Sequence, residues 1–276
     1  MLLCDPKLPF THVSLRFHAG WMDEEDDGRE QRLQLLLCLR FLERLSVVSI
    51  DSVVGPAATR DWLLPCIGSL QGLRLWLANG HVGRIQVLDG GSLPSLQWVE
   101  LCGVCAQPSD GERGLVRIVC ASTQLTRLRL ERCDLAEDEP GVLASATQLR
   151  HLEMRDASLP AGCRHGITTL AQLTALHLPV HGAEWDEPLE TLGPLTALRQ
   201  LSLHGEDCSA QVLASLPTSL TSLSLDLSGQ AGRPPLAQLE RLPSLQQLWL
   251  GPAALIHGRG AARLRKAIPG LTLELV

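Results

Sequence analysis

Four residues have types and spacings that occur in metal or redox sites. Cys102 and Cys105 are separated by two residues, and His177 and His181 lie four residues apart. A zinc site built on a CxxC pair needs a second ligand pair at a matching spacing, and a redox CxxC lies beside a βαβ pattern. Neither context surrounds Cys102, and His177 points outward from an expected strand while His181 falls at an inward loop position. We therefore expect no metal site here, with a redox or metal role for the CxxC as the minor alternative.

Motifs for covalent or phosphate chemistry are absent from the sequence. It holds no phosphate-binding loop, no GxSxG, no dinucleotide fingerprint and no HExxH. The His and Cys residues that could act at a concave-face active site are scattered over distant segments. We expect a protein that is not an enzyme and that uses no cofactor.

A second group of residues has the chemistry of protein recognition. Trp and Arg are enriched at the energetic centres of interfaces, and Trp76 and Trp98 fall on the exposed side of neighbouring segments. Glu100, Arg129 and Glu153 alternate in sign on successive strands, which lie about 4.8 Å apart in a sheet. Such a row forms cross-strand pairs worth about 0.2–1 kcal/mol each, binds a partner, or does both. The residues predicted to contact a partner are Trp76, Trp98, Glu100, Arg127, Arg129, Glu131, His151, Glu153, Arg155 and His177.

A repeated segment positions these residues. The stretch 124–135, QLTRLRLERCDL, places Leu128 and Leu130 on one face of an extended chain and Arg127 and Arg129 on the other. A strand that is apolar on one side and charged on the other needs copies of itself stacked alongside.

The sequence supplies ten copies of this pattern. Their first apolar residues are Phe10, Leu42, Leu70, Leu96, Leu125, Leu149, Leu173, Leu198, Leu220 and Leu245. The steps between them run from 22 to 32 residues, mostly within the range of about 20–29 expected for leucine-rich repeats. The second copy is aligned on Leu42, Leu45 and Val47.

The chain must return across the other side of the solenoid between strands. Apolar spacing predicts helical returns at 33–45, 62–70, 189–195, 212–216 and 236–242. Glycine and proline in 160–169 predict no more than one helical turn there. The stretch 258–269 is amphipathic and predicts a capping helix, with a basic binding patch as the alternative.

Composition and charge indicate which partners and which cellular compartment to expect. The net charge of −6 offers no general attraction to nucleic acid or to anionic membranes. Nine cysteines without regular spacing indicate reduced thiols in a cytoplasmic, reducing compartment, with the cytoskeleton or nucleus as further locations. The N-terminus lacks the features of a signal peptide, and no apolar run is long enough to span a membrane.

The whole chain resembles an intracellular leucine-rich repeat protein of the ribonuclease-inhibitor-like or cysteine-containing type. The resemblance implies an α/β solenoid, a curved horseshoe with a parallel concave sheet and short helices or loops on the convex side. It departs from the family where Asn or Cys bonds the neighbouring repeat, since only Cys133 conforms. We expect one repeat domain over 1–276, closed by a capping helix and strand at 258–276.

Three functions are consistent with this resemblance. The first is a non-enzymatic interaction scaffold, a monomer, that binds a protein partner on its concave face. The second is the substrate-recognition part of an F-box-type ubiquitin-ligase receptor, although no F-box helices precede Phe10. The third is a structural component of a cytoskeletal or ciliary assembly.

Overall fold

The computed structural model describes thirteen stretches of the chain, which fall into two compact units. They are residues 11–17, 46–53, 60–64, 69–78, 83–87, 93–103, 122–133, 143–156, 161–179, 192–204, 210–226, 236–251 and 258–275. The first unit comprises Met1–Gln148 and Asp156–Gly166, and the second comprises Leu149–Arg155 and Ile167–Val276.

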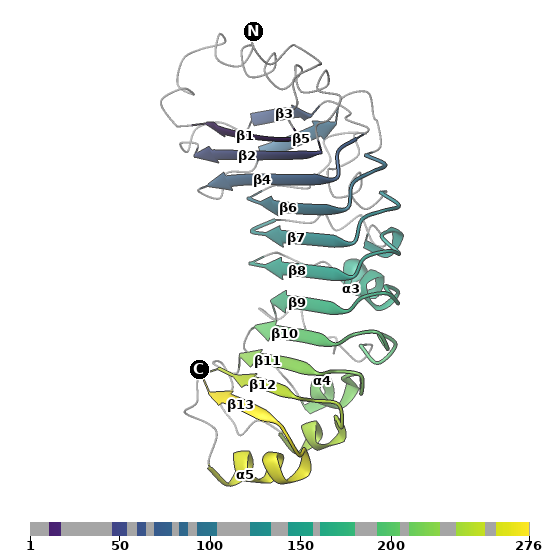
Figure 1. Ribbon diagram of the computed structural model, residues 1–276, viewed down its shortest axis with the longest axis vertical. Helices are drawn as coiled ribbons and strands as arrows, with labels where there is room; N and C mark the ends of the chain where they lie inside the picture. The colour runs from purple at the N-terminus through teal and green to yellow at the C-terminus, as the bar shows by residue number, and fades with distance from the viewer. Residues whose placement is uncertain are drawn as a thin grey trace. The chain divides into compact units, whose positions relative to one another are not determined.

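The first unit is built on parallel strands that follow one another in chain order (Figure 1). Side by side these are β1 (His12–Phe17), β2 (Val47–Val53), β4 (Gly72–Ala78), β6 (Trp98–Cys102) and β7 (Arg127–Glu131). Two further strands, β3 (Arg60–Leu64) and β5 (Gly83–Val87), pair in parallel as a small separate sheet. A single 3-10 turn, η5 (Leu143–Ser145), follows β7 in the chain.

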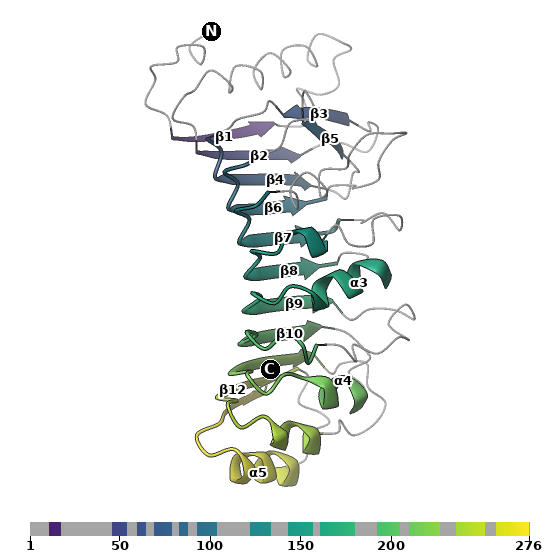
Figure 2. The same cartoon turned by 90° about the vertical axis from the view of Figure 1, so that its right-hand side faces the viewer.

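The second unit continues the same pattern of parallel strands. In order these are β8 (His151–Arg155), β9 (Ala175–Pro179), β10 (Gln200–His204), β11 (Ser222–Asp226), β12 (Gln247–Leu250) and β13 (Thr272–Leu275). Three helical segments, α4 (Ala210–Ser215), the 3-10 helix η7 (Leu236–Arg241) and α5 (Gly258–Ala267), contact one another in succession. Figure 2 shows α4 beside the strands of this unit and α5 beyond the last of them. A further helix, α3 (Ala161–Thr168), precedes β9.

Aliphatic side chains form the core of each unit. In the first unit the register aligns Val48 with Leu73, then Leu73 with Val99 and Val99 with Leu128, and none of these is more than 1 % exposed. In the second unit leucines of β8 to β12 form a row of their own, and they are equally buried. Fully burying one such side chain contributes about 1.5–3 kcal/mol, so these rows are the main source of stability.

The register corrects the alignment of the second copy. Val48 lies opposite Leu73 and is fully buried, so Val48, and not Val47, holds an inward position of β2. The copy therefore begins at Leu45 and not at Leu42. The interpretation with Val47 pointing inward is wrong. The adjacent apolar residues Val47 and Val48 allow two alignments of the motif, and the sequence alone does not decide between them.

Two of the predicted returns also differ from the structure. The stretch from Trp62 forms strand β3 where a helix was predicted, and it ends before Pro65, which disfavours helical backbone at the preceding residue. The stretch at 160–169 forms α3, which is longer than one turn. Gly166 of α3 packs closely on Ala144, where a Cβ would come within 3.2 Å of the Ala144 backbone nitrogen, so this glycine serves packing.

The other returns agree or lie outside the described residues. Helical turns occur at α4 and η7, and α5 lies inside the stretch for which a helix was predicted. Residues 192–195 form a turn. The predicted helix at 33–45 and the remainder of 189–195 are outside the described part of the chain.

Hydroxyl groups bond the loop backbone at the entry edge of several strands. The residue just before a strand donates its hydroxyl to the carbonyl of the preceding repeat, as Thr126 does to Gln97 at 3.1 Å and Thr221 does to Arg199 at 3.1 Å. Ser46 and Thr174 make the same contact. The same carbonyls also accept backbone N–H groups of the next repeat, so the hydroxyl row adds a further hydrogen bond to each of these contacts.

The exit edge of the strands is bonded differently. The Cys133 thiol lies 3.6 Å from the Leu101 carbonyl of the neighbouring repeat, which confirms its predicted role. The residues that follow β6, β7 and β8 have left-handed backbone, with φ of 69° at Gly103, 52° at Arg132 and 46° at Asp156. The chain changes direction where it leaves these strands, and this backbone conformation is strained at the two positions that are not glycine.

Candidate functional site

The side of the sheet opposite the buried leucines carries the candidate site. We call this side the polar face and define it by alternate strand residues. In the first unit the described positions are His12, Ser14, Arg16, Val47, Ser49, Gly72, Arg74, Trp76, Trp98, Glu100, Cys102, Arg127, Arg129 and Glu131. In the second unit they are His151, Glu153, Arg155, Ala175, His177, Gln200, Ser202, Ser222, Ser224, Asp226, Gln247, Trp249, Thr272 and Glu274.

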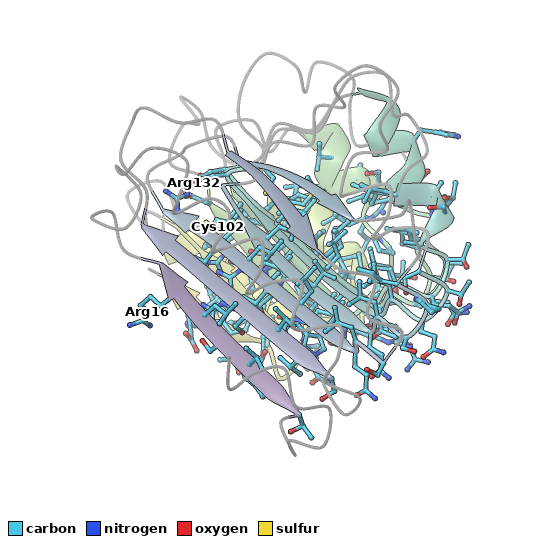
Figure 3. The ribbon with its side chains drawn as sticks, turned by 90° about the horizontal axis from the view of Figure 1, so that it is seen from above. Arg16, Cys102 and Arg132 are labelled. Carbon is cyan, nitrogen blue, oxygen red and sulfur yellow. The ribbon has the colours of Figure 1, made fainter. Side chains whose placement is uncertain are left out.

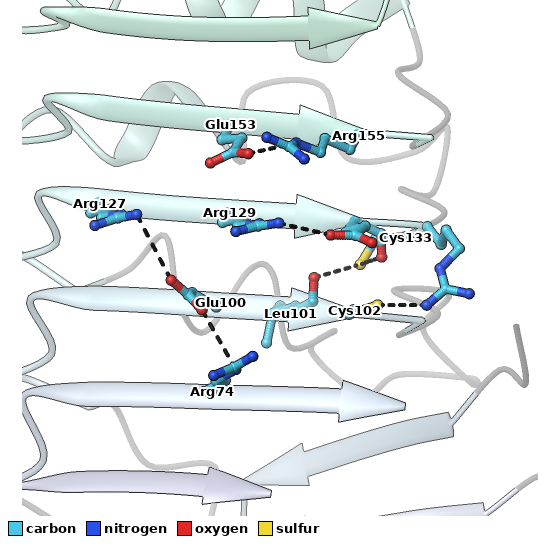
Figure 4. A network of polar contacts seen from close by, with 11 residues as sticks. Arg74, Glu100, Leu101, Cys102, Arg127, Arg129, Cys133, Glu153 and Arg155 are labelled. Carbon is cyan, nitrogen blue, oxygen red and sulfur yellow. Dashed lines mark hydrogen bonds and ion pairs between the residues drawn. The ribbon is translucent and has the colours of Figure 1, made fainter. Parts of the chain in front are cut away.

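Glu100 lies at the centre of an ion-pair group on three strands of the first unit. Its two carboxylate oxygens are 3.6 Å from Nε of Arg74 and 3.9 Å from Nη2 of Arg127 (Figure 4). The two arginine side chains are 44 % and 54 % exposed, so solvent screens these pairs. The group orients side chains on β4, β6 and β7 more than it stabilises the fold.

The part of the predicted alternating row that lies in the first unit is present in the strand register, but its ion pairs differ from those expected. Glu100 lies opposite Arg129 on the adjacent strand, as expected. Arg129, however, donates to Glu131 on its own strand at 3.0 Å, and Glu153 in the second unit is paired with Arg155 at 2.6 Å. Neighbours two apart on a strand point to the same side, so these in-strand pairs compete with the cross-strand ones.

The two tryptophans of the first unit are held by different neighbours. The Trp98 indole lies over Gly72, where an added Cβ would collide with its ring atoms. The Trp76 ring lies 5.5 Å from the guanidinium carbon of Arg74, a cation–π distance. Both indoles are partly exposed, and both are oriented by residues on β4.

Cys102 ends the polar face of β6 and is held by Arg132. The Arg132 guanidinium donates to the Cys102 sulfur at 3.0 Å, and Figure 3 shows the two side chains against each other while Arg16 projects outward from β1. Burial raises the pKa of the Cys102 thiol, and it outweighs the hydrogen bond and the charge of Arg132, which act in the opposite direction. A protonated, buried thiol is a poor nucleophile.

Of the other residues whose spacing is typical of metal or redox sites, only His177 is described. Cys105 and His181 lie outside the described residues. Among the residues that are described, no group of three or more His, Cys, Asp or Glu side chains is placed to hold a metal ion. No described helix is long and apolar enough to cross a bilayer.

The predicted residues of the second unit form a shorter polar array. Glu153 on β8 lies opposite His177 on β9, and His151 lies opposite Ala175. Further along, the central positions of β10 and β11 are Ser202 and Ser224. The charged residues at the described polar-face positions of this unit are Glu153 and Arg155 on β8, Asp226 on β11 and Glu274 on β13.

Sequence reasoning left Arg74 and Gly72 out of the predicted site. Arg74 contacts both Trp76 and Glu100, so it links the aromatic and the charged parts of the first unit's polar face. Gly72 shapes the seat of Trp98. The sequence could have indicated Arg74, because it holds the same position in its repeat as Glu100 and Arg129 do in theirs. Nothing in the sequence indicated the role of Gly72.

The fold has counterparts among solved structures. An internalin (inlF) of Listeria monocytogenes is similar over 86 % of this chain and 69 % of its own, with a TM-score of 0.50 and 15 % sequence identity. The fold is that of a leucine-rich repeat protein. This confirms the repeat architecture predicted from the leucine spacing.

Two further leucine-rich repeat structures are similar at lower scores. One is the ectodomain of the plant receptor kinase GASSHO1/SCHENGEN3 of Arabidopsis thaliana, in complex with CASPARIAN STRIP INTEGRITY FACTOR 2, with a TM-score of 0.44, 14 % identity and coverage of 86 % and 30 %. The other is the circular protein CroV588, with a TM-score of 0.43, 14 % identity and coverage of 95 % and 33 %. The chain thus spans about a third of the length of each. No family model and no curated protein matches the sequence.

Proposed function

We propose that this leucine-rich repeat protein is a non-enzymatic scaffold that binds a protein partner through its polar face. The observation that carries the proposal is the array of partly exposed Trp76, Trp98, Arg74 and Arg127 on three adjacent strands. Large aromatic and guanidinium side chains on a surface carry most of the binding energy in protein interfaces. On this face they are available to a partner.

The sheet beneath these residues favours binding. Backbone hydrogen bonds between parallel strands fix β4, β6 and β7, and a rigid surface loses little conformational entropy when it binds. Gly72 and Arg74 further restrict the two indoles. Affinity then rests on a few preorganised anchors.

The test begins with purification of the partner from cells by affinity capture and mass spectrometry. Trp98→Ala combined with Arg129→Ala should weaken the partner's binding at least tenfold in a titration, because it removes one anchor and disrupts the Glu131 pair. Arg265→Ala, an exposed change on α5, is the matched control and should bind as the unmodified protein does. Equal affinity of the double variant, with an unchanged thermal unfolding curve, would contradict this site.

The proposal also includes the cellular location and the oligomeric state of the protein. We place the protein as a monomer in a reducing, intracellular compartment, and the free thiols of Cys102 and Cys133 support this placement. Subcellular fractionation and light scattering test it. Two results would favour the alternatives. Capture of ubiquitin-ligase subunits would indicate a substrate receptor, and co-sedimentation of the protein with microtubules would indicate a cytoskeletal role.

A further inference from the structure

Two arginines of the first unit share one carboxylate. Arg74 and Arg127 approach different oxygens of Glu100, at 3.6 Å and 3.9 Å. A charge-assisted N–H···O bond is typically about 2.7–2.9 Å long, so both contacts are loose. One carboxylate neutralises one of the two positive charges, and each guanidinium presents five donors.

The remaining charged residues of these strands do not remove this excess. Arg129 and Glu131 form their own pair at 3.0 Å and are 24 % and 18 % exposed. At the described polar-face positions of β4, β6 and β7 there are therefore three arginines and two glutamates. The patch carries a net positive charge on a chain whose formal charge is −6.

Aromatic rings flank the two arginines. Trp76 stacks with Arg74, and Trp98 occupies the register position directly opposite Arg127. Trp98 is also seated on Gly72, so its ring lies close to the sheet. The patch thus combines two guanidinium groups with two apolar surfaces.

We propose that this patch binds an acidic segment of another protein. An aspartate or glutamate side chain of the partner enters between Arg74 and Arg127, and apolar side chains next to it pack on Trp76 and Trp98. Arginine forms bidentate pairs with carboxylates, and exclusion of water in an interface strengthens them. The inference rests on the proposed function and specifies the chemistry of the partner.

A library of random twelve-residue peptides displayed on phage tests the inference. Selected peptides are synthesised in two forms, one with the natural carboxylates and one with Asn and Gln in place of Asp and Glu. We expect the carboxylate form to bind at least tenfold more tightly, and its affinity to fall as salt concentration rises.

Variants of the protein locate the binding site. Arg74→Gln combined with Arg127→Gln should lower the affinity for the carboxylate form at least tenfold. Arg265→Gln combined with Lys266→Gln removes two exposed charges from α5 and is the matched control, which should retain full affinity. Circular dichroism and thermal unfolding establish that both double variants are folded.

Glu100→Gln tests the role of Glu100, because two possible roles predict opposite changes in peptide affinity. Glu100 competes with the incoming carboxylate for both arginines, so its neutralisation should tighten binding of the acidic peptides at least threefold. A role for Glu100 in holding the arginines in place predicts the opposite, a loss of affinity. This variant therefore shows whether Glu100 competes with the partner's carboxylate or holds the two arginines in place.

Three outcomes would overturn the inference. They are equal affinity for the two peptide forms, no effect of the Arg74 and Arg127 changes, and self-association of the protein that depends on these two arginines. If the captured cellular partner still loses affinity with the Trp98 and Arg129 double variant, the polar face remains the binding surface and only its acidic specificity is wrong.

Discussion

The polar faces of the two units rest on similar rows of buried aliphatic residues and present different side chains. In the first unit β4 and β6 carry Arg74, Trp76, Trp98 and Glu100, whereas the central positions of β10 and β11 in the second unit are small serines. Both sets stand on strands whose inward residues are almost completely buried. The inward positions are constrained by burial, and the outward positions are free to vary, so the scaffold and its recognition chemistry are separable.

The largest effect should follow from a change in the shared scaffold. Leu128→Ala on β7 and Leu223→Ala on β11 each leave a cavity among fully packed leucines and should each lower the free energy of unfolding by about 2–5 kcal/mol. Urea unfolding measures the loss. The adjacent outward changes Arg127→Ala and Ser222→Ala are the controls and should stay within about 0.5 kcal/mol. A small loss in only one unit would show that the two rows are not equivalent.

The next effect concerns a glycine that distinguishes the two polar faces. Gly72→Ala should displace the Trp98 indole and lower stability by about 1–3 kcal/mol, because the added methyl group occupies the position of the ring. Tryptophan fluorescence should shift to longer wavelength as the indole becomes more exposed. Ala175 holds the corresponding position of the second unit and already carries a Cβ.

A double-variant cycle isolates this contact. Gly72→Ala in a Trp98→Ala background should cost little, because the colliding ring is gone. The same loss in both backgrounds would assign the effect to backbone changes at Gly72 and would contradict the proposed seat for the indole.

Most of the fold follows from the sequence because its signal is repeated. One LxxLxL segment is a weak indication, but ten at similar spacings predict stacked parallel strands, which the structure confirms. The error at Val48 arose where consecutive apolar residues allowed two alignments, and only pairing with Leu73 decides between them. The strand β3 was missed because its pairing with β5 depends on a segment about twenty residues away in the chain.

The candidate site was less predictable than the fold. Alternation along a strand correctly indicates which side chains share a face, so the register of Glu100 opposite Arg129 could be foreseen. The choice of ion-pair partner could not, because Arg129 reaches Glu131 as readily as it reaches a neighbouring strand. Side-chain orientation of this kind depends on rotamers and on neighbours such as Gly72, which sequence spacing does not encode.

A smaller loss of stability should follow when a hydroxyl group just before a strand is removed. Both units have such hydroxyl groups. Thr126→Val and Thr221→Val keep the shape of the side chain and remove one hydrogen bond each, so each should cost about 0.5–1 kcal/mol. The low value is expected because the Gln97 carbonyl also accepts the backbone N–H groups of 126 and 127. Thr123→Val, outside this row, is the control in chemical denaturation. A similar loss for the control would mean that the row adds nothing.

The smallest effect is one of pH and concerns the end of β6 in the first unit. Burial raises the pKa of Cys102 in the folded protein, so the folded state holds this proton more tightly than the unfolded state does. Its contribution to stability is complete below about pH 8.5, the ordinary pKa of a thiol, and is lost as the pH rises through the higher folded value. The difference in unfolding free energy between the unmodified protein and Cys102→Ala should therefore shrink as the pH rises above about 8.5. In urea unfolding, a constant difference would mean that Arg132, which donates to the sulfur at 3.0 Å, cancels the effect of burial, and a growing difference would mean that it outweighs burial and stabilises the thiolate.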